Sequence, residues 1–466
     1  MHSTDWSRRR LTLALVGLAL LAAGAAAAGT PVRATYGAQT TADEPQYLLS
    51  AVSLAEDGNL DISDELAERR WLAWHEAQLP AQTKPLSDGR HVSPHDPLLP
   101  VLLAGPVAAG GWVGAKLTLS LLAGVLAAAT AWTAVRRFAI SPAVALAVCG
   151  VFFCSAPLAV YGTQIYPELP AALVTLLGVA ALTTPLRGRA CVVLAAAVVA
   201  LPWLAIKYAP VAAALAGIAF VRLLREGRRA SALGLVGGLV AAGLVFLGVH
   251  LVVWEGLTAY ASGDHFVGGE FTAVGSAPNY PGRARRLIGL FVDREFGLAA
   301  WQPAWLLAVP AFAVAARLRP PHWLTLAVPV GVAWLNATFV ALTMHGYWFP
   351  GRQVVVVLPL VVLAIAGLAD QARVWRTITL TLGVVGLWSY GWLVADGLGR
   401  RITWVVDFFE VGDPWYAVWS RALPAYRYAS TATTVQHAVW GVLLVGGALL
   451  AFRLGHRARA GAGRRS

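Results

Sequence analysis

The sequence predicts an all-α polytopic membrane protein with about twelve transmembrane helices. Hydrophobic residues make up 58% of the 466 residues and charged residues only 13%, which is about half the charged share of a typical soluble domain. The mean hydropathy is +0.63. Apolar runs of roughly 17 to 25 residues recur along the whole chain, and a helix of that length crosses the hydrocarbon core of a bilayer.

The net charge of +12 does not indicate binding to nucleic acid, because the arginines lie in short gaps between apolar runs. The positive-inside rule predicts this distribution for cytoplasmic loops. If both termini are cytoplasmic, the inner face carries twenty basic and three acidic residues, and the outer face carries sixteen basic and twenty-one acidic residues. The composition, rich in Ala, Val, Arg and Gly, suggests a bacterium of high GC content. We therefore expect a multi-pass protein of the bacterial cell (inner) membrane.

The first apolar run follows three arginines, Arg8 to Arg10, and extends over residues 11–29. A basic stretch, a Leu-rich run and then small residues are also the pattern of a cleaved signal peptide. The run is nevertheless long enough to span a membrane, and eleven more spans follow. We expect residues 1–29 to form a cytoplasmic N-terminus and the first transmembrane helix, and the residues after them face outward under either interpretation.

Residues 30–111 are expected to form an extracytoplasmic acidic loop with interfacial helices. Its polar part contains eleven acidic and five basic residues. One helix should begin near Pro45, because Thr41-x-x-Glu44 forms a capping box and Pro is favoured at the first helical position. A second helix is predicted over residues 64–79, which carry an imperfect apolar stripe suited to the interface. The apolar, proline-broken residues 97–111 are interpreted as an interfacial or re-entrant piece.

The remaining chain alternates spans with two further outer loops and ends in a basic tail. Transmembrane helices 2–7 are assigned to residues 112–254 and helices 8–11 to residues 298–395. Outer loops are assigned to residues 255–297 and 396–434, and the last helix with a cytoplasmic tail to residues 435–466. The eleven spans after the first are predicted at residues 112–135, 141–160, 166–184, 190–206, 208–222, 231–254, 298–316, 323–343, 353–369, 377–395 and 435–452.

Several ionisable residues are predicted to meet at the outer face. Asp43 and Glu44 are adjacent carboxylates just after the first span, and Glu168, Lys207 and Arg352 lie at the ends of remote spans. Ionisable groups at such depths are costly to desolvate, so they tend to be paired or functional. Carboxylates that accept a proton, together with cations that hold a phosphate, are what transfer of a group from a lipid phosphate needs.

A series of short motifs occurs in a fixed order over about residues 10–369. The motifs are Asp43-Glu-Pro-x-Tyr-Leu, Glu56-Asp-Gly-Asn-Leu-Asp, His95-x-Pro, Tyr166-Pro-Glu-x-Pro-Ala, Trp203-x-x-x-Lys-Tyr-x-Pro, Arg294-Glu-Phe-Gly-Leu and Phe349-x-Gly-Arg-Gln. As an ordered set they resemble bacterial membrane glycosyltransferases of the GT-C superfamily. The similarity is to the branch of protein O-mannosyltransferases and lipid A aminoarabinose transferases. The last two spans and the tail carry no mark of this family.

The resemblance implies an inverting glycosyltransferase that moves a sugar from a polyprenyl-phosphate donor to a hydroxyl on the outer face. It implies that Asp43 is the general base and that Glu44 orients the acceptor or the base. The donor phosphate is expected to bind Lys207 and Arg352 first, with Lys84 and Arg283 behind them. Substrate-positioning roles are expected for the remaining motif residues Glu168, His95, Tyr166 and Tyr208.

The expected partners are membrane lipids, a polyprenyl-phosphate-linked sugar, and a glycan, lipid or protein acceptor of the cell envelope, with no nucleic acid. No cofactor is required, although a divalent metal could bridge the phosphate and the carboxylates of Asp43, Glu44 and Glu168. The three cysteines lie in apolar runs, so neither a disulfide framework nor a CxxC metal site is predicted. The identities of the sugar and the acceptor stay open.

Each residue of this predicted site also has a simpler, non-catalytic interpretation. Asp43 and Glu44 could only cap a helix, Glu168 could only end one, Lys207 could be an interfacial anchor, and Arg352 could be a solvated turn residue. His91 and His95 have weak metal spacing, and Asp57 to Asp61 lack the ligands of a calcium loop and are interpreted as a turn. Alternative functions are a transporter or flippase of a lipid-linked precursor, or a non-catalytic envelope assembly protein. No two-fold repeat of the transporter kind is found.

Overall fold

The computed structural model describes residues 6–264, 268–271, 275, 277–428 and 430–462. Asp5, one of the three acidic residues assigned to the inner face, and the part of the basic tail beyond Ala462 lie outside these residues. In the described part of the chain the secondary structure is helical, and β pairing is limited to isolated bridges. The chain is an all-α polytopic membrane protein, as the sequence predicts.

Seven helical segments are long and apolar enough to cross a membrane. They contain α1 (Arg8–Ala27), α4 (Leu98–Arg137), α9 (Ala209–Arg225), α10 (Arg229–Val253), α15 (Trp323–Leu335), α17 (Arg373–Leu398) and α19 (Thr431–Ala462). Five shorter apolar segments contain α5 (Pro142–Phe153), α7 (Glu168–Leu182), α8 (Arg189–Leu204), α14 (Ala308–Leu318) and α16 (Leu358–Gln371). These segments correspond in order to the twelve predicted spans.

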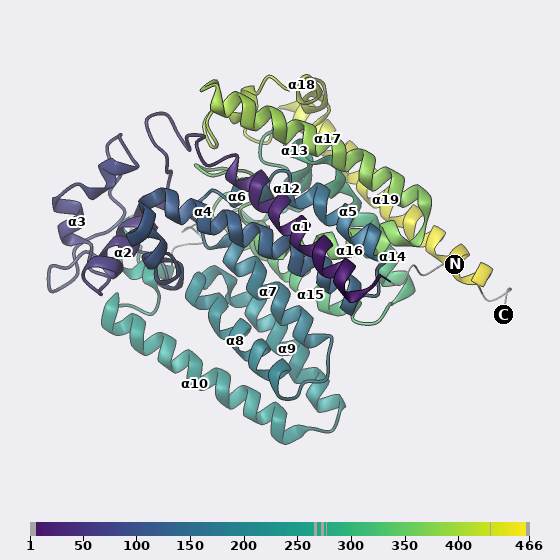
Figure 1. Ribbon diagram of the computed structural model, residues 1–466, viewed down its shortest axis with the longest axis horizontal. Helices are drawn as coiled ribbons and strands as arrows, with labels where there is room; N and C mark the ends of the chain where they lie inside the picture. The colour runs from purple at the N-terminus through teal and green to yellow at the C-terminus, as the bar shows by residue number, and fades with distance from the viewer. Residues whose placement is uncertain (1–5, 265–267, 272–274, 276, 429, 463–466) are drawn as a thin grey trace.

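Small residues bring the first helix against the bundle. A Cβ atom placed on Gly124 of α4 would lie 2.3 Å from the carbonyl oxygen of Ala19 and 3.0 Å from Cβ of Ala23 on α1. Gly and Ala allow such close approach of helices in membranes, where packing rather than the hydrophobic effect drives association. Helix α1 therefore lies beside α4 in the centre of the molecule, whereas α10 lies at its edge (Figure 1).

The two ends of the bundle carry different parts of the chain (Figure 1). Helix α2 (Glu44–Glu56) and α3 (Ser63–Ala67) lie at one end, and the end of α19 lies at the opposite one. Helix α2 packs against α4, and the loops that precede α2, α7 and α16 converge beside it. This convergence positions the candidate site.

One local prediction for the first loop differs from the structure, and another agrees with it. The predicted helix over residues 64–79 is only α3 and a 3₁₀ turn (Arg70–Ala73), because the following residues pair with the segment after α1: Gln39 N–H donates to Trp74 O at 2.9 Å, and Glu76 N–H to Gly37 O at 3.0 Å. The segment predicted as a separate piece, residues 97–111, forms the helical stretch before a break in α4, where Gly110 and Gly111 have non-helical backbone angles. Gly111 has φ +56°, a conformation that favours glycine.

Candidate functional site

The adjacent acids Asp43 and Glu44 point in different directions at the start of α2. Asp43 precedes the helix but its side chain makes no capping hydrogen bond. Its Oδ2 instead lies 2.5 Å from Nη2 of Arg352. The carboxylate of Glu44 accepts hydrogen bonds from the backbone N–H of Thr41 at 2.8 Å, as the capping box predicts, and of Ile165 at 2.6 Å. Glu44 therefore ties the turn before α2 to the loop before α7.

A chain of ion pairs joins four of the predicted site residues. Arg352 Nε lies 3.0 Å from Glu168 Oε1, and Lys207 Nζ lies 2.7 Å from the same oxygen. Arg352 thus bridges Asp43 and Glu168, and we call these four residues the ionic network. The side chain of Glu168 is fully buried and that of Arg352 is 7% exposed, whereas those of Asp43 and Lys207 are 26% and 24% exposed. Two carboxylates and two cations make the network neutral, which lowers the cost of burying it.

Aromatic rings line the network and restrict its arginine. The guanidinium carbon of Arg352 lies 3.9 Å from the ring centre of Tyr166 and 4.9 Å from that of Trp348, within the range of cation–π attraction. Lys207 Nζ lies 5.2 Å from the ring centre of its neighbour Tyr208. His95 stacks on Tyr47 of α2 with ring centres 4.6 Å apart. The motif tyrosines and His95 therefore pack around the network and α2.

Asp43 and Glu44 have different surroundings, which shift their pKa values in opposite directions. Burial raises the pKa of Asp43, but the positive charges of Arg352 and His95 and the hydrogen bond from Arg352 outweigh it, so that this pKa lies well below its ordinary value. Burial raises the pKa of Glu44 to about 7, although Lys116 and the two backbone N–H groups oppose the shift. Asp43 is therefore a carboxylate at neutral pH, and Glu44 titrates near neutrality.

Two supporting contacts were not predicted from the sequence. Asp96 accepts the backbone N–H of Ile206 at 2.8 Å, and its other oxygen lies 3.0 Å from Nε2 of the buried His250. This pair fixes the 3₁₀ turn (Ile206–Tyr208) that carries Lys207. Lys116 is buried in α4 and donates to Gln39 O at 2.7 Å. The available signal was an ionisable side chain inside an apolar span, which is costly unless it is paired.

Lys84 and Arg283, the two further cations expected to bind the donor phosphate, are not part of the ionic network. Lys84 is exposed, and its backbone N–H donates to Ser262 O at 3.0 Å. Arg283 is buried, and its Nη1 donates to Phe339 O at 2.6 Å.

The divalent metal set suggested from the sequence does not form among the described residues. Asp43 and Glu168 both face the guanidinium of Arg352, and both oxygens of Glu44 accept backbone N–H groups. Among the described residues the oxygens of these three carboxylates do not gather within 4.8 Å of one another, as they would to share one ion.

An apolar groove of about 420 Å³ lies among α8, α9 and α10 and includes Ile206, the residue before Lys207. Trp203, Ile206 and Phe246 contribute to its wall, and Phe271 closes it from the second outer loop. Ile206 directly precedes Lys207, so the groove reaches the turn that carries a cation of the network. Its lining has the composition that a hydrocarbon chain prefers.

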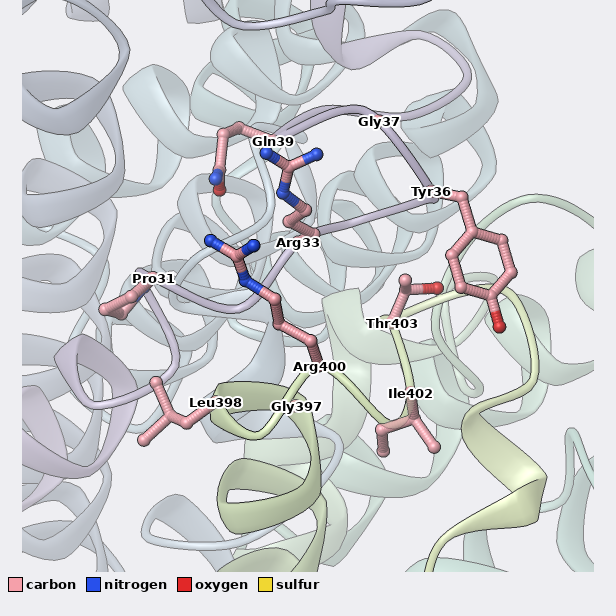
Figure 2. Close-up of a pocket in the computed structure, with 10 residues that line it drawn as sticks. All are labelled: Pro31, Arg33, Tyr36, Gly37, Gln39, Gly397, Leu398, Arg400, Ile402 and Thr403. Atoms are coloured by element: carbon pink, nitrogen blue, oxygen red, sulfur yellow. The ribbon is translucent and has the colours of Figure 1, made fainter.

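A polar cavity of about 410 Å³ lies between the segment after α1 and the loop after α17. Figure 2 shows the guanidinium groups of Arg33 and Arg400 close to each other in this cavity, with Gln39 beside them. Arg33 pairs with Glu76 at 3.2 Å, whereas no ion pair of Arg400 is found within the described ranges. The cavity is therefore basic, and half of its wall comes from the part of the chain that carries no family motif.

No model of a known protein family matches the sequence, and no curated protein matches it. Among solved structures the chain is similar to ArnT from Cupriavidus metallidurans, which was crystallised bound to undecaprenyl phosphate. The TM-score is 0.56 at 15% sequence identity, and the match covers 97% of this chain and 78% of the ArnT chain. At this identity the likeness shows the fold. The predicted all-α polytopic membrane fold is confirmed, whereas membership of the GT-C superfamily and the branch within it stay predictions.

Proposed function

We propose that the protein is an inverting GT-C-type glycosyltransferase that moves a sugar from a polyprenyl-phosphate donor to a hydroxyl of a cell-envelope acceptor. The reaction is assigned to the outer face of the bacterial cell membrane, with both chain termini in the cytoplasm. One observation carries the proposal: Arg352 joins Asp43, the proposed base, to Glu168 and through it to Lys207. The ionic network thereby joins a base and two phosphate-binding cations from three remote segments, so that one sugar phosphate could contact all three.

The proposed reaction is a single displacement at the anomeric carbon. The acceptor hydroxyl gives its proton to a carboxylate oxygen of Asp43, and its oxygen bonds to the sugar carbon from the side opposite the phosphate. The bond from that carbon to the phosphate oxygen breaks, and its electron pair stays on the polyprenyl phosphate. The leaving group gains negative charge, so Arg352 and Lys207 stabilise it more strongly in the transition state than in the bound donor.

The resting ion pair gives the donor a second role. Arg352 Nη2 contacts Asp43 while no phosphate is bound, and this contact weakens Asp43 as a base. A donor phosphate that accepts hydrogen bonds from Arg352 takes over part of this interaction. The pKa of Asp43 then rises toward its ordinary value, so the base gains strength only when the donor is in place.

Two further observations support a lipid donor. The lining of the apolar groove includes Ile206, the residue before Lys207, so we expect a polyprenyl chain in the groove to bring its phosphate toward the network. The structurally similar ArnT was crystallised with undecaprenyl phosphate, which is a lipid phosphate of this chemical class.

Transfer of labelled sugar tests the proposed function. Purified protein in lipid nanodiscs is incubated with a panel of polyprenyl-phosphate sugars and with fractions of the cell envelope. We expect label to leave the lipid and enter one fraction, with inverted configuration at the anomeric carbon. In sealed vesicles without any acceptor, movement of the intact lipid-linked sugar across the bilayer would support the transporter alternative and contradict the proposal.

Glu44 gives a prediction for the pH dependence. Below about pH 7 its carboxyl takes up a proton, which occupies an oxygen that accepts the N–H of Thr41 or Ile165. We expect kcat/KM for sugar transfer to decrease as the pH falls through about 7, because the turn before α2 loosens. The free-enzyme pKa of Asp43 lies too low to cause this decrease. Glu44→Gln should transfer sugar more slowly at every pH, but its kcat/KM should no longer decrease as the pH falls through about 7. If the decrease persists in this variant, a group other than Glu44 causes it.

The basic cavity of Figure 2 gives a prediction for acceptor binding. If it receives a negatively charged group of the acceptor, Arg400→Gln removes a charge-assisted hydrogen bond of about 1.5 kcal/mol. The concentration of acceptor fraction needed for half-maximal transfer should then rise about tenfold, with the donor KM unchanged. Arg421→Gln, an exposed arginine of the same loop that does not line the cavity, is the control. Equal kinetics of the two variants would contradict this assignment.

A further inference from the structure

Three carboxylates meet at the C-terminal end of α2, away from the ionic network. Asp57 follows the last residue of α2, and Asp64 and Glu65 lie in the first turn of α3. One oxygen of each carboxylate lies within 4.8 Å of the other two. Asp57 and Asp64 are exposed, whereas Glu65 is only 2% exposed. We call these residues the α2–α3 acid cluster.

The nearby arginines neutralise other acids. Arg70 pairs with Glu56 at 2.6 Å and with Glu68 at 3.5 Å, and Arg90 pairs with Asp88 at 2.6 Å. Within the described ranges no ion pair joins a basic side chain to any member of the cluster. Three carboxyl groups therefore converge without a basic partner, an arrangement that is unfavourable when all are ionised unless a proton or a cation is bound.

The buried member gives an independent sign of a missing ligand. Glu65 Oε2 is buried and, among the described residues, has no hydrogen-bond partner. A buried carboxylate oxygen that is left unpaired costs free energy.

The chain between α2 and α3 holds the cluster together without using its carboxylates. Asn59 Oδ1 accepts the N–H of Asp61 at 2.7 Å, and Asp61 Oδ1 accepts the hydroxyl of Ser63 at 2.6 Å and the N–H of His91 at 3.2 Å. Asp61 is thus part of the turn that its sequence predicts. Because these bonds fix the turn, Asp57, Asp64 and Glu65 face one another whether or not a ligand is present.

We propose that Asp57, Asp64 and Glu65 form a Ca²⁺ site that ties the C-terminal end of α2 to α3. Ca²⁺ binds carboxylate oxygens at about 2.3–2.6 Å with a variable number of ligands, so it can contact oxygens that lie about 5 Å apart, and water completes its shell at the exposed side. Mg²⁺ needs about 2.0–2.1 Å in strict octahedral geometry, which draws its ligands closer together. The site holds one end of α2, whose other end carries Asp43 and Glu44, and it does not depend on the proposed enzyme activity.

Isothermal titration with CaCl₂ tests the site on the full chain in phosphatidylcholine nanodiscs, after treatment with EDTA and with empty nanodiscs as the blank. We expect one Ca²⁺ per chain. Glu65→Gln and Asp64→Asn should each weaken binding about tenfold or more, whereas Asp88→Asn, an exposed acid of the same loop that pairs with Arg90, should bind as the wild type does. Ca²⁺ should raise the melting temperature of the wild type and of Asp88→Asn but not of Glu65→Gln.

Melting curves in EDTA show whether the variants fold, since Glu65→Gln removes a buried carboxyl group that has no basic partner and should melt at the wild-type temperature or above. Absence of Ca²⁺ binding by the wild type at millimolar concentration would overturn the proposal. So would unchanged binding in both Glu65→Gln and Asp64→Asn, or a wild-type affinity for Mg²⁺ equal to that for Ca²⁺.

Discussion

Replacing Asp43 with Asn is expected to lower kcat for sugar transfer by about 10²–10⁴-fold, the usual contribution of a general base. The donor KM should not increase, because Arg352 loses its resting partner and stays available for phosphate. Steady-state kinetics with a labelled polyprenyl-phosphate sugar measure both constants.

Asp88→Asn is the matched control for this variant, because it neutralises a carboxylate that is paired with Arg90 outside the network. Transfer at the wild-type rate by Asp43→Asn would remove Asp43 from the mechanism. If Glu44→Gln were inactive at every pH while Asp43→Asn kept its activity, the roles of the two acids would be exchanged.

Replacing Arg352 with Gln is expected to weaken donor binding and to lower the stability of the fold, and both effects should be large. The change leaves Asp43 and the buried Glu168 without their shared cation, and removing one partner of a buried ion pair costs about 3–5 kcal/mol. The donor KM should rise about a hundredfold, which corresponds to the loss of about two charge-assisted hydrogen bonds to phosphate. Arg352→Lys should recover part of the stability but little of the donor binding, because ammonium cannot reach both carboxylates and a phosphate as the planar guanidinium does.

A double variant separates the two effects of this change. Arg352→Gln combined with Glu168→Gln removes the carboxylate that is left uncompensated, so the melting temperature should recover. Donor binding should not recover, because no cation replaces the guanidinium. Recovery of transfer to the wild-type rate in the double variant would show that Arg352 serves only the fold.

The membrane fold and the members of the network could be predicted because both follow from local sequence. Span length follows from apolar runs, and the positions of Glu168, Lys207 and Arg352 at span ends place them at one face once the spans are ordered. Their pairing could not be predicted, since Arg352 reaches Asp43 across 309 positions of the chain. Whether it contacts one carboxylate or two depends on how four separate segments pack.

Other features could not be predicted, because they depend on tertiary contacts that no clear sequence pattern indicates. The short α3 in place of a helix to residue 79 results from pairing of residues 37–39 with residues 74–76, and tertiary pairing of this kind overrides an imperfect helical pattern. The different environments of Asp43 and Glu44 arise from partners at Arg352 and Ile165. His250 and Lys116 stand out only as ionisable residues within apolar runs, and their partners Asp96 and Gln39 lie in the first loop.

A structure with bound undecaprenyl phosphate tests the central claim most directly, because it locates the phosphate relative to the ionic network. We predict that the phosphate oxygens accept hydrogen bonds from Arg352 and Lys207, that the contact between Arg352 and Asp43 lengthens, and that the lipid lies along the groove lined by Trp203 and Phe246. A phosphate bound elsewhere, with the four ion-paired side chains unchanged, would contradict the account.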